Sequence, residues 1–469
     1  MSEEKEIDLS EWEQASTKKM IHYSFGFLLV FFVAGQFNAY VFYYYEVEIG
    51  LPVALLGLAF IIFAVWNMIN DPLIGYLTDR PFRWTRKWGW RFPWIMAATI
   101  PYLICWFLLF APPESLVRQT DPWPIFWYFV IIACLFDTFY SLYSTHINAG
   151  FTNHFRTDAE RRKSSAINLT APRILALTMG FIVPVFYVYG DRSSMILAQS
   201  LIILMLIICV LILIPGIRES EDLKERFLRG YESTERLSYF KTMKSAFKKR
   251  NFVVALTVFM LLALAGTLAS ASGVYFMKDI LGLPLSYAIF TGIAGFIGFM
   301  LFIPFWSNVV KKIGHAKTMK LGLILICLVY LPSLWITTLL ELIIFTFIGG
   351  FAVGAFWITL GPVTADVNDE NTVTTGKHQE GALAGIRTFF FRFALIFQAV
   401  IFTVVHIATG YNPDPQAKQT PLAMWGIRIH MGLIPSILAL LAFIIMKKWY
   451  DLEREKRIAI QHKLRQLNL

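Results

Sequence analysis

The stretch LPVALLGLAFIIFAVWNMI (residues 51–69), followed by NDPLIGYLTDR (residues 70–80), decides how this chain folds. Its first part carries no charged residue and is long enough to cross a bilayer, which takes about 20 apolar residues as a helix. Asp71 follows this run directly, and an ionisable group inside such a segment is costly unless it faces a partner, water or an ion. Asp79 and Arg80 mark the return of the helix to water. The stretch predicts a transmembrane helix with a functional carboxylate at Asp71, and it indicates transport across a membrane.

The composition extends this prediction to the whole chain. The sequence is 57% hydrophobic and 16% charged, whereas soluble domains carry about 25% charged residues. The formal charge of +10 comes from Lys and Arg in alternate loops, as the positive-inside rule requires, so no nucleic-acid partner is expected. The four cysteines lie inside apolar runs at no metal-ligand spacing, and they are predicted to be packing residues. We therefore expect an all-α polytopic membrane protein in contact with lipid and without a bound metal.

Twelve transmembrane helices are predicted from the repeated apolar segments. The first six cover residues 21–45, 52–78, 92–111, 124–152, 165–189 and 194–216. The second six cover residues 251–278, 284–311, 316–338, 340–366, 380–408 and 425–447.

A charged stretch divides these helices into two sets of six. We expect an N-terminal half at 1–216, a cytoplasmic linker at 217–250, a C-terminal half at 251–448 and a cytoplasmic tail at 449–469. The linker and the tail carry both signs of charge and suit exposed helices along the membrane surface. The basic loops place both termini in the cytoplasm, so the chain is predicted to be integral to a plasma or cell inner membrane.

Other membrane classes were weighed against a transporter. A twelve-span channel or a membrane-embedded enzyme can share this composition. No HExxH, CxxC, Walker or GxSxG element occurs in a suitable place. The sequence therefore favours a transporter over an enzyme and predicts no organic cofactor.

Four short stretches carry a resemblance to a known family. The two most specific are residues 70–80, continued by the loop RKWGWRFPW at 86–94, and ADVND at 365–369, continued by TGK at 375–377, EG at 380–381 and RT at 387–388. Two weaker stretches are APR at 171–173 and KKIGHAK at 311–317. Together they lie in both halves, so the resemblance covers essentially the whole chain.

These stretches resemble the glycoside–pentoside–hexuronide:cation symporters, the melibiose-permease-like branch of the major facilitator superfamily. The resemblance implies a six-plus-six fold with one site between the halves near the middle of the membrane. It also implies symport of a sugar-like small molecule with a coupling cation, Na+ or H+, by alternating access.

The resemblance places a cation site on the predicted helix at 52–78. The family's asparagine and one carboxylate fall on Asn70 and Asp71, and its other carboxylate falls on Asn67. These three residues share one helix face because their spacings are three and four. Asp137 lies close to the family's acidic position on the fourth helix but is displaced by about one residue, which rotates a side chain by roughly 100°. Losing one formal charge leaves Na+ and H+ both open.

A purely structural role for these charges is the competing interpretation. In it, Asp71 pairs with Arg173, or Asp137 pairs with Arg392, and neither pair binds a cation.

The resemblance also implies the substrate residues. Arg173 matches the family's sugar-binding arginine, Tyr140 a stacking aromatic, Trp357 a site tryptophan, and Arg392 a lysine that links the sugar and cation sites. Thr388 is the fifth predicted substrate residue. The aspartate that grips galactosides falls at about Phe31, so we expect the two arginines to favour an anionic solute such as a uronide, a sulfonated sugar or a phosphate-bearing head.

Gating is predicted for charged residues of the two specific stretches, which would break and remake the cytoplasmic closure. They are Asp79, Arg80, Arg91, Asp366, Asp369 and Arg387.

Two other functions remain open at this point. A lysophospholipid or lipid carrier of the same fold would need a greasy cavity with a lateral opening. A non-transporting receptor would keep its activity without Asp71. Elsewhere, Tyr43, Tyr44 and Tyr45 are predicted to form an interfacial aromatic belt, and His406 and His430 to lie at the interface.

Overall fold

The computed structural model describes residues 15–466 apart from 79–80, 156, 169–170, 226–227, 229–238 and 377–378. Within this part, twelve helices are long and apolar enough to cross a membrane, which confirms the predicted fold class. The N-terminal half consists of α1 (Thr17–Gln36, continued by η2 Phe37–Val41 and η3 Tyr44–Glu48), α2 (Val53–Thr78), α4 (Phe92–Phe110), α5 (Trp123–His154), a fifth span built from α6 (Asp158–Asn168), α7 (Ala171–Gly180) and α8 (Ile182–Phe186), and α9 (Arg192–Ile217).

The C-terminal half repeats this plan. Its spans are α12 with η5 (Arg250–Tyr275 and Phe276–Ile280), α13 with α14 (Ala288–Leu301 and Ile303–Ile313), α15 with η7 (His315–Tyr330 and Leu331–Leu334), α16 (Leu339–Thr375), α17 (Glu380–Thr409), and α18, η8 and α19 (Pro421–Arg428, Ile429–Leu433 and Ile434–Trp449). Short helices outside the spans are α3 (Thr85–Trp88), η4 (Glu114–Leu116), α11 (Tyr239–Ala246), η6 (Leu285–Tyr287) and α20 (Arg454–Gln466).

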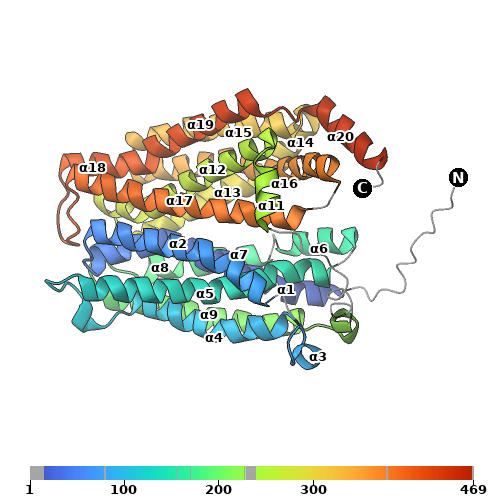
Figure 1. The fold of residues 1–469 in the computed structure, drawn as a ribbon. Coiled ribbons are helices and arrows are strands. Elements are labelled where there is room, and N and C mark those ends of the chain that lie inside the picture. The colour runs from blue at the N-terminus through green and yellow to red at the C-terminus, as the bar shows by residue number, and fades with distance from the viewer. Residues whose placement is uncertain are drawn as a thin grey trace.

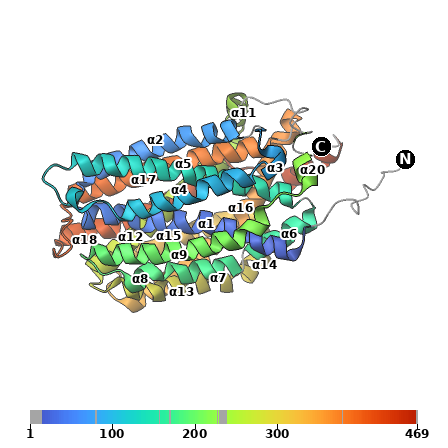
Figure 2. The same ribbon diagram turned by 90° about the horizontal axis from the view of Figure 1, so that it is seen from below.

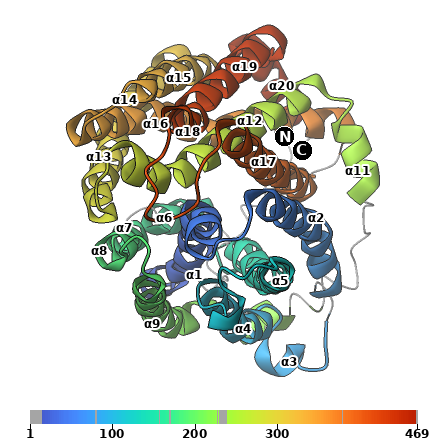
Figure 3. The ribbon, with the colours of Figure 1, turned by 90° about the vertical axis from the view of Figure 1, so that its left-hand side faces the viewer.

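The two halves form parallel slabs that meet along their long axes (Figure 1). Both α3 and α20 lie at one end of the bundle, which we call the terminal end, and α18 lies at the other, which we call the opposite end (Figures 1 and 2). Seen along the helix axes, the helices form a ring in which α2 and α17 are neighbours across the junction (Figure 3). There the Thr403 hydroxyl of α17 donates to the Val53 carbonyl of α2 at 3.3 Å. This contact joins the halves next to the opposite end.

The largest difference from the predicted boundaries is in α16. The helix runs to Thr375 instead of residue 366, and Val367, Asn371 and Thr372 of its last turns are buried against the rest of the protein. It ends at Gly376, whose φ of 67° is accessible to glycine without a steric cost. Polar residues after an apolar run therefore continued the helix and did not end it.

The helices α13 and α16 pack closely through glycines. A Cβ atom on Gly298 would overlap the backbone carbonyl of Phe347, and one on Gly295 would contact the Thr346 carbonyl at 3.5 Å. Gly292, in contrast, faces Phe181 of the N-terminal half. Small residues let the α13 and α16 backbones approach closely.

The predicted aromatic belt and interfacial histidines are wrong. Tyr43, Tyr44 and Tyr45 each have 0% exposed surface, and His406 and His430 are 2% and 0% exposed. All five lie inside the protein near the opposite end, because the first span continues through η3 into the junction between the halves. An apolar environment alone does not distinguish lipid from the protein interior.

A charged cluster between the two halves

The core of the candidate site is one face of α2. Asn67 and Asn70 are buried, at 1% and 4% exposed, and Asp71 follows them. Their spacings of three and four turn all three side chains the same way. That face points toward α5, which supplies the second carboxylate.

Asp137 of α5 is brought directly onto the α2 face. Its side chain is 1% exposed, and it accepts hydrogen bonds from the Asn67 amide and from the Asn70 amide, the latter at 3.2 Å. One turn further along α5, the Ser141 hydroxyl donates to Asp71. The charge that Asn67 lacks is therefore supplied by Asp137, so two carboxylates converge here. Ser141 gave no signal in the sequence, because a serine in an apolar helix is common and its direction depends on packing.

The cluster is completed from the other half of the protein. Arg392 of α17 forms an ion pair with Asp71, with 2.8 Å between its Nη2 atom and the carboxylate Oδ2 atom. The two side chains are 13% and 23% exposed, so the pair is largely shielded from water. The competing structural interpretation predicted other partners, Arg173 for Asp71 or Asp137 for Arg392. The pair that forms joins α2 to α17 across the junction.

Two buried polar atoms of the cluster, Oδ1 of Asn67 and Nε of Arg392, have no hydrogen-bond partner among the described residues. The Oδ1 atom of Asn67 is buried and accepts no hydrogen bond from the part of the chain that the structure describes. A buried acceptor without a partner is costly, and such groups in proteins call for an explanation. An amide oxygen beside two carboxylates has the hard-ligand character that small cations prefer.

Arg173 lies apart from this cluster. It lines a cavity of about 350 Å³ together with residues of α1, α6 and α7, and its guanidinium lies 5.7 Å from the ring centroid of Phe31. Asn168 and Ser165 contribute polar groups to the same cavity. Phe31 is the position to which the resemblance assigns the family's acidic residue. The cavity therefore has a cation facing an aromatic ring in place of an ion pair.

Three further predicted substrate residues are Tyr140, Trp357 and Thr388. Tyr140 follows Asp137 on α5, and its hydroxyl donates to the Val30 carbonyl of α1 at 3.4 Å. Trp357 is 54% exposed and packs against its neighbour Phe356. Thr388 is exposed and donates to the Ala384 carbonyl of its own helix at 3.1 Å.

Comparison with known proteins identifies the family. The model of the family described as MFS/sugar transport protein matches residues 22–454. The chain belongs to this family. It is 23% identical to the uncharacterized symporter YnaJ of Bacillus subtilis over 95% of this chain and 94% of that protein. It is also 23% identical to the human sodium-dependent lysophosphatidylcholine symporter 1, over 84% of this chain and 75% of that protein.

Solved transporters share the fold of this MFS protein. The crystal structure of a D-xylose–proton symporter aligns with a TM-score of 0.61 at 15% identity, covering 92% of this chain and 98% of the other. The nucleoside transporter NupG aligns with a TM-score of 0.60 at 13% identity, covering 92% and 100%. The predicted major facilitator fold is thereby confirmed, and the chain is a membrane transporter.

Three of the predicted gating residues of this MFS transporter interact inside their own halves. Arg91 lies beside His146, with 3.5 Å between its Nη1 atom and the ring Nδ1 atom. Asp366 bonds to His315, and Arg387 donates to the Thr364 hydroxyl at 3.1 Å. Asp369 follows Asp366 on α16, whereas Asp79 and Arg80 lie outside the described residues.

The tail of this MFS transporter packs against the C-terminal half. Arg457 of α20 lies 2.9 Å from the His315 ring, and Lys320 pairs with Glu453 at 3.1 Å. The prediction of a tail helix lying along the membrane surface omitted these contacts.

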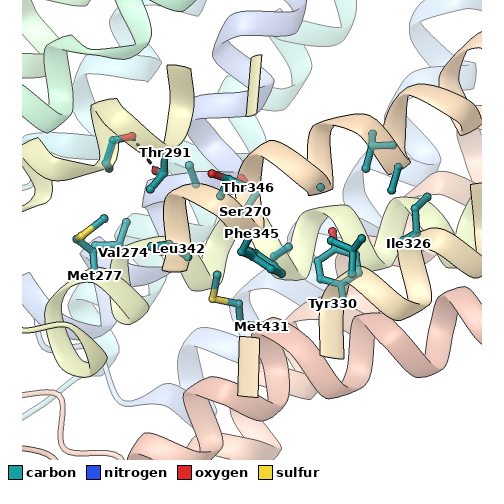
Figure 4. Close-up of a pocket in the computed structure, with 18 of the residues that line it drawn as sticks. Ser270, Val274, Met277, Thr291, Ile326, Tyr330, Leu342, Phe345, Thr346 and Met431 are labelled. Atoms are coloured by element: carbon teal, nitrogen blue, oxygen red, sulfur yellow. Dashed lines mark hydrogen bonds between the residues drawn. The ribbon is translucent and has the colours of Figure 1, made fainter. Parts of the chain in front are cut away.

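An apolar cavity of about 320 Å³ lies within the C-terminal half of the MFS transporter (Figure 4). Leu342, Phe345 and Met431 line it, and Tyr40 of the N-terminal half reaches its wall. Ser270, Thr291 and Thr346 are among its few polar side chains. The cavity suits an apolar group better than a sugar ring.

Glu219, just after α9, is a structural residue that sequence reasoning missed. Its carboxylate accepts the backbone N–H groups of Trp90 and Arg91, the latter at 3.1 Å, and so holds the loop before α4. Burial raises the pKa of Glu219 above its usual value, although the Arg91 and Trp90 N–H groups and the Arg91 charge oppose the shift. The sequence did not single out Glu219, because it is the first of several acids that follow the sixth span.

Glu219→Gln is expected to change the pH dependence of stability. Because the pKa of this carboxyl is raised in the folded state, its contribution is present below the unfolded pKa and is lost as pH rises through the folded pKa. The amide keeps an acceptor for the N–H groups and does not titrate. The melting temperature of Glu219→Gln minus that of the wild type, measured from pH 4 to 8, should therefore increase as pH rises.

Glu219→Ala provides the contrast. It leaves the two backbone donors without this acceptor and is expected to cost about 1–3 kcal/mol at neutral pH. If the Gln and Ala variants have the same stability at every pH, Glu219 does not hold the loop.

Proposed function

We propose that this transporter carries out cation-coupled symport of a small organic solute with an anionic group, by alternating access. The observation that carries the proposal is the ion pair between Asp71 of α2 and Arg392 of α17, which lies within the membrane-spanning helices and joins the two halves. An intramembrane charge pair across a moving junction is costly to keep unless it serves transport.

The coupling cation would bind beside Asp71. Asp137, Asp71 and the Oδ1 atom of Asn67 offer oxygen ligands for Na+, or a carboxylate that takes up H+. Either cation neutralises charge next to Asp71 and weakens its hold on Arg392. Arg392 is then free to meet an anionic solute, so each ligand raises the affinity for the other.

The structure would correspond to one state of the cycle. At the terminal end, Arg91, Arg387 and Asp366 interact within their own halves, which supports an open state there. At the opposite end, residues of both halves are buried against one another. The basic loops at the terminal end support its placement in the cytoplasm, so the protein would face inward.

The solute would be sugar-like and anionic. Arg173 offers a cation in a cavity with Asn168 and Ser165, and arginine binds carboxylate, sulfonate and phosphate groups through paired N–H donors. Phe31 faces that cation, and the described residues that line the cavity include no acid. A uronide or sulfonated sugar fits these groups.

A lysophospholipid is the second candidate, favoured by the apolar cavity. That cavity could hold an acyl chain, at about 0.8 kcal/mol for each buried CH₂. Several relatives are named sodium-dependent lysophosphatidylcholine symporters, and a phosphate head would suit the same arginines.

The melting temperature of the purified protein tests these alternatives. A ligand that binds only the folded state raises the free energy of unfolding by about 2.7 kcal/mol at a hundred times its dissociation constant. The melting temperature rises with it. Sugar acids, their neutral parent sugars and lysophosphatidylcholine are compared in Na+ and in choline at pH 6 and pH 8. A shift by a sugar acid that grows with Na+ or with acidity supports the proposal. A shift by lysophosphatidylcholine alone favours the second candidate, and equal shifts with and without a coupling cation contradict symport.

A further inference from the structure

A second buried charged cluster lies at the opposite end, outside the candidate cation site. Glu46 of η3 is 1% exposed and faces two residues of the C-terminal half, Tyr275 and His406. Its carboxylate accepts the Tyr275 hydroxyl at 2.5 Å and lies 2.8 Å from the His406 Nδ1 atom. The His406 Nε2 atom lies 3.3 Å from the Nε2 atom of His430, whose Nδ1 atom lies 2.6 Å from the Ser272 hydroxyl. We call these residues the outer relay.

The halves divide the outer relay in a simple way. Glu46 belongs to the N-terminal half, whereas Tyr275, His406, His430 and Ser272 belong to the C-terminal half. Any motion that opens the opposite end must therefore pull Glu46 away from His406 and Tyr275. Closure must bury the Glu46 carboxylate against them again.

Hydrogen-bond accounting limits the protons that the closed relay can hold. Ser272 donates to the Leu268 carbonyl at 2.6 Å, so its oxygen accepts from His430 Nδ1–H. The Nε2 atom of His430 is then an acceptor, and His406 must donate to it through its own Nε2–H. A bond between His406 Nδ1 and Glu46 then needs one more proton, carried by either partner. With that proton the Glu46–His406 pair has no net charge.

The arrangement without this proton is possible only at a cost. In that arrangement both imidazoles adopt the other tautomer. The Ser272 hydroxyl then donates to His430 and no longer to the Leu268 carbonyl. This arrangement also leaves the Glu46 carboxylate as a buried net negative charge. Burying an uncompensated charge is among the most costly events in a protein interior, so the protonated arrangement is favoured when this end is closed.

The surrounding charges do not neutralise Glu46 in another way. On η5, Lys278 pairs with Asp279 at 3.0 Å, and Asp279 also accepts the Tyr411 hydroxyl at 2.9 Å. Glu48 accepts the Tyr187 hydroxyl and the Gly190 N–H, both from the N-terminal half. The other polar rings around the relay are Tyr43, which packs edge-on to Tyr275, and Tyr411, which stacks on His406. Lys278 therefore already has a carboxylate, and Arg428, two residues before His430, donates to the Ser333 and Leu334 carbonyls.

We propose that the outer relay is a second proton-binding site, in which closure of the opposite end takes up one proton between Glu46 and His406 and opening releases it. This inference rests on the proposed alternating access, but it requires no particular solute. When the halves part, both groups enter water, where a free histidine loses its proton above about pH 6.5 and a glutamic acid above about pH 4.3. Acidity then favours the state closed at the opposite end.

Distance measurements between spin labels test this inference without any substrate. Labels at Thr120→Cys and Thr337→Cys, both exposed in loops of the opposite end, are placed in a chain whose four native cysteines are replaced. One linked proton predicts that the closed-to-open ratio falls about tenfold for each pH unit above about 6.5. Glu46→Gln mimics the protonated acid, so this variant should remain closed at the opposite end and its closed-to-open ratio should not change with pH. His406→Asn should also lose the pH dependence.

Glu48→Gln is the matched control. Glu48 is buried to 2%, two residues from Glu46, but both of its partners belong to its own half, so the pH dependence should persist. A ratio that does not change with pH in the wild type overturns the inference, as does a dependence that survives Glu46→Gln. A dependence lost in Asp71→Asn but retained in Glu46→Gln assigns the proton to the α2 site. If no solute raises the melting temperature but the closed-to-open ratio still depends on pH in this way, only the proposed substrate is overturned.

Discussion

Asp71→Asn is expected to reduce coupled uptake in proteoliposomes by about 100-fold or more. The variant removes the charge that we propose binds the cation, and it leaves Arg392 without its ion-pair partner. Removing one partner of a buried pair costs about 3–5 kcal/mol. Because Asp71 and Arg392 are 23% and 13% exposed, we expect a loss of stability smaller than this. A loss of about 2.7 kcal/mol in the transport cycle is enough to reduce the uptake rate 100-fold.

The double variant Asp71→Asn/Arg392→Gln separates transport from stability. It removes both charges, so the free energy of unfolding should recover toward the wild-type value while uptake remains lost. Recovery of uptake in the double variant would make the pair a structural contact only. Asp137→Asn is a further comparison: it keeps the Asp71–Arg392 pair, so its stability should change little while cation dependence is lost. Uptake unchanged in Asp71→Asn would favour the non-transporting receptor.

Arg173→Gln is expected to weaken the binding of an anionic solute by roughly 10- to 100-fold. A hydrogen bond to a charged group contributes about 1.5–3 kcal/mol, and each 1.4 kcal/mol is tenfold in affinity. The apparent affinity for the best sugar acid, measured by its melting-temperature shift or its uptake, reports the loss. The neutral parent sugar should be affected much less.

Two variants sharpen this test of the Arg173 cavity. Phe31→Asp places a carboxylate where the ring now faces Arg173, so it should weaken anion binding and favour hydroxyl-rich neutral solutes. Arg162→Gln removes an equal charge from an exposed position of α6 that does not line the cavity, and it should leave affinity unchanged. Equal losses in Arg173→Gln and Arg162→Gln would mean that only the general positive field attracts the solute.

The composition and the apolar runs predicted most of the fold. Twelve spans and the six-plus-six plan follow from the length of each run, since a helix satisfies its own backbone hydrogen bonds in lipid. The end of α16 was the main exception: the predicted span ends at residue 366, but the mostly polar stretch 367–375 continues the helix. Hydropathy marks where a helix leaves lipid, which is a different place from where the helix stops.

Part of the candidate site was also predictable. Asn67, Asn70 and Asp71 share a face because the geometry of a helix fixes their spacing, and Arg392 stood out as a charge in an apolar span. The sequence suggested that Asp71 pairs with Arg173 or that Asp137 pairs with Arg392, whereas Arg392 pairs with Asp71. Their pairing depends on which helices lie next to each other across the junction.

What the sequence by itself determined, then, is the number of spans, the face of α2 that carries the carboxylate, and the charges that need partners. Only the tertiary structure placed Asp137 against Asn67 and Asn70, and only it buried Glu46 with His406. The physical reason is that each residue turns a side chain by about 100° around its helix. Lipid and the protein interior are equally apolar, so packing alone decides which buried polar groups meet.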